Sequence, residues 1–342
     1  MRGMRSGTTR AVLALALVAA VAVACGRAPG KSDKTAARPE AAERTTRLFL
    51  ASDGELTVVD VATGTSRTIP VRELAAGDPP VRVVRRGEKL VFYGVDTYAI
   101  DLDLQSPPEK LAESSFFVPS ADPNRVWVAI VDPESPETVR ALSAVREIAV
   151  DGRVTASGTP PPAWVESAVP GGLVFGARDG ALKAWDPVRQ KIMRALPGRY
   201  AGFPHGDRFP SCDDRLLYVT DVGTGARTSY EPPEGFAGFG CREAAFSPRG
   251  NLLAVPVLTR REVDAERALA LVDLDRGTVM PVAGSDVEAG YVYVTWASTG
   301  ESVFITGGER FERRSLLEYR LGAGRATRVP VELDDFYGIA AS

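Results

Sequence analysis

Short apolar runs, separated by Gly, Pro and Asp, recur along the chain from about residue 47 to its end. These runs are rich in β-branched and aromatic residues, and stretches with the 3.6-residue period of an amphipathic helix are scarce. Strands joined by tight turns give this pattern. The sequence therefore predicts an all-β chain.

The stretch LVDLDRGTVMPV, residues 271–282, shows how one of these runs ends. Asp273, Asp275 and Gly277 stand at alternate positions, like the first ligands of a calcium loop, but an EF-hand loop would continue to a chelating Glu. Here the chain returns to a strand-like run at Thr278. We therefore expect a hairpin corner, in which Asp accepts backbone N–H groups and Gly supplies a positive φ.

Similar corners recur along the chain, which indicates a repeated unit. They lie at about residues 60, 101, 151, 186, 221, 273 and 320. Their spacings of 35 to 52 residues scatter around the roughly 40 to 50 residues of a four-stranded propeller blade. The corners predict a single β-propeller of seven four-stranded blades, and the weak boundaries of the third and fifth units leave six or eight blades open.

Two pairs of segments resemble a known family. FSPRGNLLA (246–254) and WASTGESVFI (296–305) resemble the aromatic-Ser-Pro-Asp-Gly turn of TolB-type and WD-repeat-like β-propellers, with Arg249 and Thr299 in place of Asp. VVDVATGTSRTI and LVDLDRGTVMPV resemble the outer hairpin of the same blades. The resemblance implies a propeller over residues 47–342 that holds a protein or peptide partner at one end of its channel. TolB itself has an additional small α/β domain, so we expect no role in the Tol system.

The two ends of the repeat region predict how the ring closes. The first unit begins at Arg47 and has room for only three strands before its successor starts near Pro80. After the last unit, residues 336–340 form one spare strand-like run. Because an open edge strand invites aggregation, we expect this C-terminal strand to pair into the first blade.

The N-terminus has the pattern of an export signal. Three arginines within the first ten residues precede an unbroken apolar run, 11–24, which is too short to span a bilayer as a helix. The small residues before Cys25 resemble a bacterial lipobox, with Ala22 where that motif most often has Leu. The resemblance implies removal of residues 1–24, a lipid on Cys25, and a location on the outer side of the cytoplasmic membrane. A plain secretory signal cleaved after Ala24 is the alternative.

Residues 26–46 contain no large apolar side chain, so we expect residues 25–46 to be a flexible tether between the lipid and the propeller. Without residues 1–24 the chain has 38 basic and 44 acidic residues, a net charge of −6. An acidic body binds polyanions poorly, so nucleic acid is not an expected partner.

The cysteines divide according to the export prediction. If Cys25 carries lipid, Cys212 and Cys241 remain as an even pair in an oxidising compartment, which favours a disulfide. Two unpaired core thiols are the alternative, and they become the better interpretation if the chain is not exported.

Few residues suggest catalysis. His205, the only histidine, lies in a Pro/Gly loop, and the chain has no zinc-protease, nucleophile-elbow or P-loop motif, so we expect no metal and no cofactor. A propeller hydrolase or lyase acting on envelope sugars or lactones is the alternative function, and it would need carboxylates that converge at the channel mouth. Candidate carboxylates are Glu166, Asp207, Asp213, Asp214 and Glu243.

Arginines concentrate in two long loops, 259–267 and 307–314, which a propeller brings to adjacent blades on the face that usually binds ligands. They are Arg260, Arg261, Arg267, Arg310, Arg313 and Arg314. Arginine suits a bidentate grip on carboxylates, so this sector could dock a protein partner. The acidic residues between the arginines favour a self-neutralised solvated loop instead. The sequence thus predicts a non-catalytic binding or scaffold lipoprotein of the cell envelope.

Overall fold

The computed structural model describes residues 46–74, 83–114, 116–131, 142–177, 180–213, 215–260, 266–288, 290, 292–308, 314–331, 333, 336 and 338–342. Residues 45–342 form one compact unit. The predicted signal peptide, the lipid site Cys25 and nearly all of the predicted tether lie outside the described residues. Within them, no helix has the length and apolar character needed to span a bilayer.

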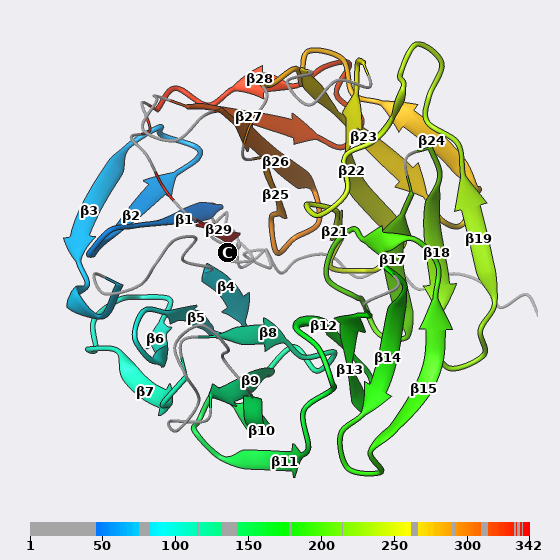
Figure 1. Ribbon diagram of the computed structural model, residues 1–342. Helices are drawn as coiled ribbons and strands as arrows, with labels where there is room; N and C mark the ends of the chain where they lie inside the picture. The colour runs from blue at the N-terminus through cyan, green and yellow to red at the C-terminus, as the bar shows by residue number, and fades with distance from the viewer. Residues whose placement is uncertain are drawn as a thin grey trace, which may run out of the picture. The chain divides into compact units, whose positions relative to one another are not determined.

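Seven antiparallel sheets are arranged as blades in a ring, and the chain passes round that ring once (Figure 1). The strands of each blade are named from the centre of the ring outward. Blade 1 consists of β29 (Gly338–Ala341), β1 (Arg47–Ser52), β2 (Glu55–Asp60) and β3 (Ser66–Pro70), and blade 2 of β4 (Val83–Arg86), β5 (Lys89–Tyr93), β6 (Thr97–Asp101) and β7 (Glu109–Ala112). Blade 3 consists of β8 (Phe117–Pro119), β9 (Arg125–Val131), β10 (Leu142–Ala149) and β11 (Val154–Gly158), and blade 4 of β12 (Val165–Val169), β13 (Gly172–Gly176), β14 (Leu182–Asp186) and β15 (Lys191–Leu196). Blade 5 consists of β16 (Arg199–Tyr200), β17 (Arg208–Cys212), β18 (Leu217–Asp221) and β19 (Arg227–Tyr230). Blade 6 consists of β20 (Gly238–Phe239) with β21 (Ala245–Phe246), then β22 (Leu252–Leu258), β23 (Arg267–Asp273) and β24 (Thr278–Pro281). Blade 7 consists of β25 (Tyr293–Trp296), β26 (Ser302–Gly307), β27 (Ser315–Arg320) and β28 (Thr327–Arg328). The short 3₁₀ helix η1 (Arg72–Leu74) follows blade 1. The prediction of an all-β propeller with seven blades is confirmed, and blade 6 has five strands because its innermost strand is split.

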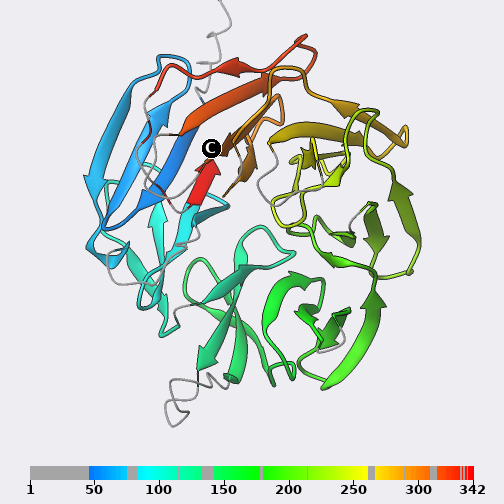
Figure 2. The ribbon, with the colours of Figure 1, turned by 45° about the horizontal axis from the view of Figure 1, so that its top comes forward.

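The ring closes as the sequence predicts. The C-terminal strand β29 pairs antiparallel with β1, with Leu48 opposite Ala341, and supplies the innermost strand of the first blade (Figure 2). Ser342 extends this contact, because its N–H donates to the Arg47 carbonyl (2.9 Å) and its Oγ accepts from the Arg47 N–H (3.0 Å). The two ends of the propeller are therefore joined by backbone hydrogen bonds.

The predicted corners are the turns between the third and the outermost strand of each blade. At the corner between β23 and β24, Asp273 Oδ1 accepts the N–H groups of Asp275 (3.1 Å) and Arg276 (2.9 Å), and Gly277 adopts a φ of 69°. Asp186 Oδ1 accepts two backbone N–H groups in the same way in blade 4. These carboxylates stabilise turns, which confirms the corner interpretation and not the calcium loop.

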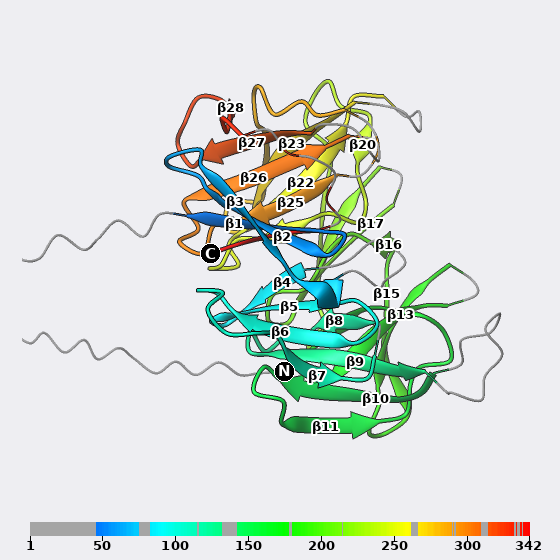
Figure 3. The same cartoon turned by 90° about the vertical axis from the view of Figure 1, so that its left-hand side faces the viewer.

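The hydrophobic core consists of layers between neighbouring blades, not of one central cluster. Phe49 of blade 1 packs with Phe92 of blade 2, and Phe304 of blade 7 packs with Leu48 of blade 1 on the other face of the same sheet. All four side chains are essentially inaccessible to solvent. The strands of each blade run between the two faces of the ring, so the turns are gathered on these faces (Figure 3).

Candidate functional site

The two faces of the ring carry different connections. Antiparallel strands place the connections between second and third strands on the same face as the connections between blades; we name this the long-loop face. The three longest second-to-third connections join β9 to β10, β22 to β23 and β26 to β27, and the last two are the arginine-containing loops that the sequence predicts. The opposite face carries the shorter turns, and we name it the short-turn face.

The innermost strand of blade 6 is interrupted near the long-loop face. Phe239 of β20 pairs with Val257 of β22, whereas Ala245 of β21 pairs with Ala254. From Phe239 to Ala245 the inner strand advances by six residues, but the paired positions on β22 advance by only three. The three additional residues form a bulge within Gly240–Ala244, which we name the blade 6 bulge.

Contacts on both sides fix the blade 6 bulge. The Gly240 N–H donates to the Pro256 carbonyl of its own blade, and the Ala244 N–H donates to the Ala201 carbonyl of blade 5, both at 2.7 Å. Gly202 forms a parallel bridge with Ala244, and a Cβ at position 202 would overlap the Ala244 carbonyl. The bulge is thus packed directly against the backbone of the neighbouring blade.

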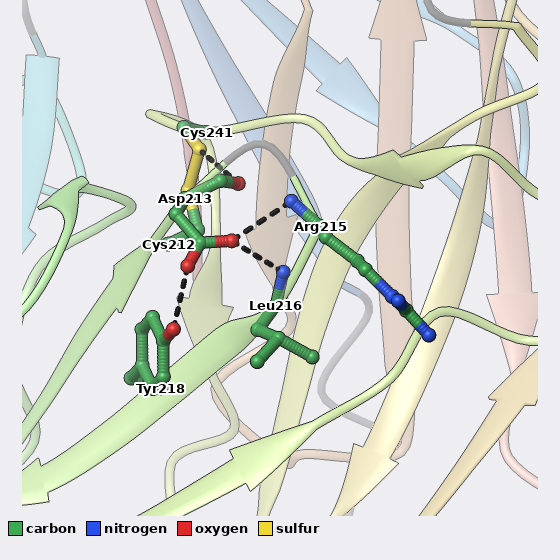
Figure 4. Close-up of a disulfide and its surroundings, with 6 residues drawn as sticks. All are labelled: Cys212, Asp213, Arg215, Leu216, Tyr218 and Cys241. Carbon is green, nitrogen blue, oxygen red and sulfur yellow. Dashed lines mark hydrogen bonds between the residues drawn. A yellow bond between two sulfur atoms is a disulfide. The ribbon is translucent and has the colours of Figure 1, made fainter.

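A disulfide between Cys212 and Cys241 adds a covalent anchor between blades 5 and 6, with the two Cα atoms 6.0 Å apart (Figure 4). Cys212 ends β17 and is fully buried, and Cys241 lies in the blade 6 bulge. The predicted pairing of these two cysteines is confirmed. The Sγ of Cys241 lies 3.8 Å from the carbonyl oxygen of Asp213, as a contact only, because a disulfide sulfur has no proton to donate.

Asp213 organises the turn that follows Cys212 (Figure 4). Its Oδ1 accepts the N–H groups of Arg215 (2.8 Å) and Leu216 (2.7 Å), and its Oδ2 accepts the Tyr218 hydroxyl at 2.5 Å. Burial alone would raise the pKa of this carboxyl, but the hydrogen bonds from Leu216 and Tyr218 outweigh burial and the pKa is lowered. Asp213 therefore stays ionised and serves as a turn cap beside the disulfide.

Arg242 occupies the centre of the blade 6 bulge and is exposed. Its φ is 113°, a conformation that L-residues other than Gly rarely adopt and that costs about 1 to 3 kcal/mol. Such strain persists only where the surrounding contacts fix the backbone, and here the disulfide and the two backbone hydrogen bonds do so. The bulge thus fixes the backbone of Arg242, whose side chain is exposed to solvent.

Next to Arg242, Glu243 faces an arginine of the same blade. Burial lowers the pKa of Arg267, and attraction to the Glu243 carboxylate partly opposes that effect. The Nε of Arg267 is buried without a hydrogen-bond partner among the described residues. Glu243 and Arg267 are therefore two half-buried side chains of opposite charge that attract each other within blade 6.

The structure describes three of the six predicted arginines, and these three have different environments. Arg260 is exposed at the start of the loop between β22 and β23, and Arg267 begins β23. Arg314 is only 3% exposed; its guanidinium lies over the rings of Tyr293 and Phe336, and its Nη1 donates to the Phe336 carbonyl (3.3 Å). Arg314 thus stabilises the interior near the closing strand. The remaining three, Arg261, Arg310 and Arg313, lie outside the described residues.

The candidate carboxylates occupy separate segments. Asp207 and Asp213 flank opposite ends of β17, which spans about 17 Å, whereas paired glycosidase carboxylates lie roughly 5 to 10 Å apart. Glu166 lies in β12, Glu243 lies in the blade 6 bulge, and Asp214 is outside the described residues. Among the described residues, no group of three or more His, Cys, Asp or Glu side chains could hold a metal ion.

His205 lies in the turn between β16 and β17, on the short-turn face. Its ring packs near that of Phe246, with centroids 6.0 Å apart, and against Gly250 of blade 6. Burial and, to a smaller extent, the charge of Arg208 lower its pKa, so the imidazole is neutral at pH 7. The histidine and the blade 6 bulge are therefore on different faces.

No protein-family model and no curated protein sequence matches the chain. Solved structures do match. Apo AztD from Citrobacter koseri is 15% identical, with a TM-score of 0.52, over 87% of this chain and 98% of its own. A chain of the mitotic checkpoint complex is also 15% identical, with a TM-score of 0.53, over 95% of this chain and 92% of its own. A protein described as a TolB from Agrobacterium tumefaciens is 14% identical, with a TM-score of 0.46, over 85% and 90%.

These likenesses show the propeller fold alone. The seven-bladed ring itself supports the predicted resemblance to TolB-type propellers at the level of architecture, and the function has to be argued from the surface of this chain. Arg242 is not among the site residues that the sequence predicts. The signal that could have found it is the adjacent Cys241, because a disulfide marks a segment whose position is fixed.

Proposed function

We propose that the chain is a non-catalytic binding protein of the bacterial cell envelope that holds a protein or peptide partner on its long-loop face. The blade 6 bulge is the observation that carries this proposal. It breaks the regular register of an inner strand, it is anchored by a disulfide, and it presents Arg242 in a strained conformation. Strain of this kind concentrates at functional sites in proteins.

The bulge favours a partner that presents carboxylates. Because the backbone of Arg242 is already fixed, binding there orders only the side chain, and arginine can donate two parallel hydrogen bonds to one carboxylate. Arg260, exposed on the same blade, adds a second positive charge to this part of the rim. We therefore expect an acidic peptide segment as the bound element.

The proposed location follows from the N-terminal pattern. Three early arginines, the apolar run 11–24 and the small residues before Cys25 support export and lipidation. The Cys212–Cys241 disulfide adds support, because structural disulfides persist in oxidising compartments. Metabolic labelling with a radioactive fatty acid tests the anchor: label is expected in the wild-type chain and is lost in Cys25→Ser. Equal labelling of both would refute lipidation at this position.

The partner proposal is tested by capture from envelope extracts with the full chain, tagged within the predicted tether. The double variant Arg242→Glu/Arg260→Glu reverses two exposed charges on the long-loop face. The control, Arg67→Glu, reverses one exposed charge on the outer strand β3. We expect recovery of the partner to fall by about tenfold or more with the double variant and to be unchanged with the control. Equal recovery with all three baits would refute this docking site.

A further inference from the structure

A cavity of about 480 Å³ opens on the short-turn face, away from the blade 6 bulge. Turns of three consecutive blades, 3, 4 and 5, contribute to it. Its lining includes the polar residues Ser120, Asp122, Arg125 and Glu147 and the apolar residues Trp127, Ala156, Pro170, Pro187 and Val188. A volume of this size is typical of small-molecule sites.

The inner wall of this cavity is one face of blade 3. Val118, Trp127, Glu147 and Ala156 are successive cross-strand neighbours from β8 to β11, so they form one row on the same side of the sheet. Trp127 is only 4% exposed, and this row packs toward Val165 and Leu173 of blade 4. Arg125 lies two residues before Trp127 on β9, which places both side chains on the cavity side.

The acceptors in the cavity are already used by internal donors. Glu147 Oε1 accepts from the Ser120 hydroxyl (2.6 Å), and Oε2 accepts from Thr155 Oγ1 (2.7 Å) and Arg125 Nη1 (3.1 Å). Asp122 Oδ1 accepts the Asn124 N–H (2.9 Å), and Oδ2 is paired with Arg125 Nε at 3.0 Å. Both carboxylates therefore fix the Arg125 guanidinium in one orientation.

Donor capacity remains on Arg125. Its Nη2 group makes no hydrogen bond or ion pair within the described part of the chain, although Nε and Nη1 are both engaged. The side chain is about one third exposed, so this edge is open to a ligand. A pre-oriented guanidinium edge with apolar walls beside it is suited to a ligand that accepts hydrogen bonds and has an apolar body.

The local charge balance permits an anionic ligand. Arg86 of blade 2 is attracted by the Asp122 carboxylate and, although burial lowers its pKa to about 10, it remains charged at pH 7. The positive charges of Arg86 and Arg125 thus balance the negative charges of Asp122 and Glu147 before a ligand arrives. A bound carboxylate would then meet an unsatisfied positive edge and no uncompensated acid.

We propose that this cavity binds a small monocarboxylate, with its carboxylate on Arg125 and its apolar chain against Trp127, Pro170 and Val188. The site lies on the short-turn face and does not depend on the function proposed for the long-loop face. Val188 stands at the mouth of the cavity and is 66% exposed, so substitutions there leave the core unchanged.

Binding of octanoate to the full chain, followed by isothermal calorimetry, tests this assignment. Octanol and octylamine share its apolar chain and lack the carboxylate, and we expect each to bind at least about tenfold more weakly. Saturable octanoate binding is expected at millimolar concentrations. Absence of octanoate binding in that range, or equal binding of octanol, would overturn the proposal.

Two variants of matched size locate the site. Val188→Glu places a negative charge at the mouth of the cavity and should weaken octanoate binding by about tenfold, whereas Val188→Lys should leave it unchanged or tighter. Both changes are at an exposed position, so thermal unfolding of the two variants should match that of the wild type. Octanoate affinity equal to that of the wild type in both variants would show that the ligand binds elsewhere.

Discussion

Breaking the Cys212–Cys241 disulfide should destabilise the propeller without unfolding it. The bond closes a loop with a sequence separation of 29 residues. The chain-entropy relation gives about 3.6 kcal/mol for a loop of this length. For a body of about 300 residues, an unfolding entropy of about 0.6 kcal/mol/K converts this loss into a decrease in Tm of about 6 °C. The backbone hydrogen bonds from Gly240 and Ala244 should keep the blade 6 bulge near its place.

Three samples distinguish the effect of breaking the disulfide bond from the effect of removing the cysteine side chains. Oxidised wild type, wild type reduced with a phosphine, and the reduced double variant Cys212→Ala/Cys241→Ala are compared by urea unfolding, followed by tryptophan fluorescence. The reduced wild type should lose about 3.6 kcal/mol, and the variant should lose more because Cys212 is fully buried and its truncation leaves a cavity. Equal midpoints for the oxidised and reduced wild type would refute the reasoning that the bond constrains the unfolded chain.

Three further predictions concern the turns and the closure of the ring. His205 is the only histidine, and its pKa is lower in the folded than in the unfolded chain, so the unfolded chain binds a proton more readily in mild acid. The free energy of unfolding should therefore fall as the pH decreases below 6.5. In His205→Gln, the urea midpoints measured between about pH 5 and 7 should lose this pH dependence. Asp213 has a lowered pKa in the folded chain, so its contribution to the free energy of unfolding is present above pH 3.8 and lost below it. Asp213→Asn should lower the free energy of unfolding by about 1 to 2 kcal/mol at pH 7, and by less in acid. A difference from the wild type that stays constant with pH would contradict this. Removal of residues 338–342 should leave β1 as an open edge and produce oligomers in size-exclusion chromatography, whereas a monomer of unchanged stability would contradict closure by β29.

The sequence predicts the ring because its information is local and repeated. In these corners an acidic side chain accepts hydrogen bonds from backbone N–H groups, as at Asp273. Such a turn can be recognised from a few consecutive residues. The closing strand is legible because the first blade lacks a strand and the last has one to spare. Both features recur or complement each other along the chain, so single boundary errors do not matter.

The parts that could not be predicted depend on contacts between distant segments. The blade 6 bulge is a change of register between the inner strand and β22. The sequence of residues 238–246 alone does not show which residues of β22 they pair with. Arg314 belongs to a loop that the sequence assigns to the surface, but the closing segment at Phe336 covers it. The cavity beside Arg125 requires turns from three blades, so only the assembled ring reveals it.

Site-specific photo-crosslinking in cells tests whether the blade 6 bulge is the binding surface of this propeller. A photo-reactive residue replaces Arg242 in the full chain within living cells, and a second chain carries the same residue in place of Arg67 on β3. We expect a discrete adduct with one envelope protein from position 242 and none from position 67. The same adduct from both positions, or no adduct from position 242, would contradict it.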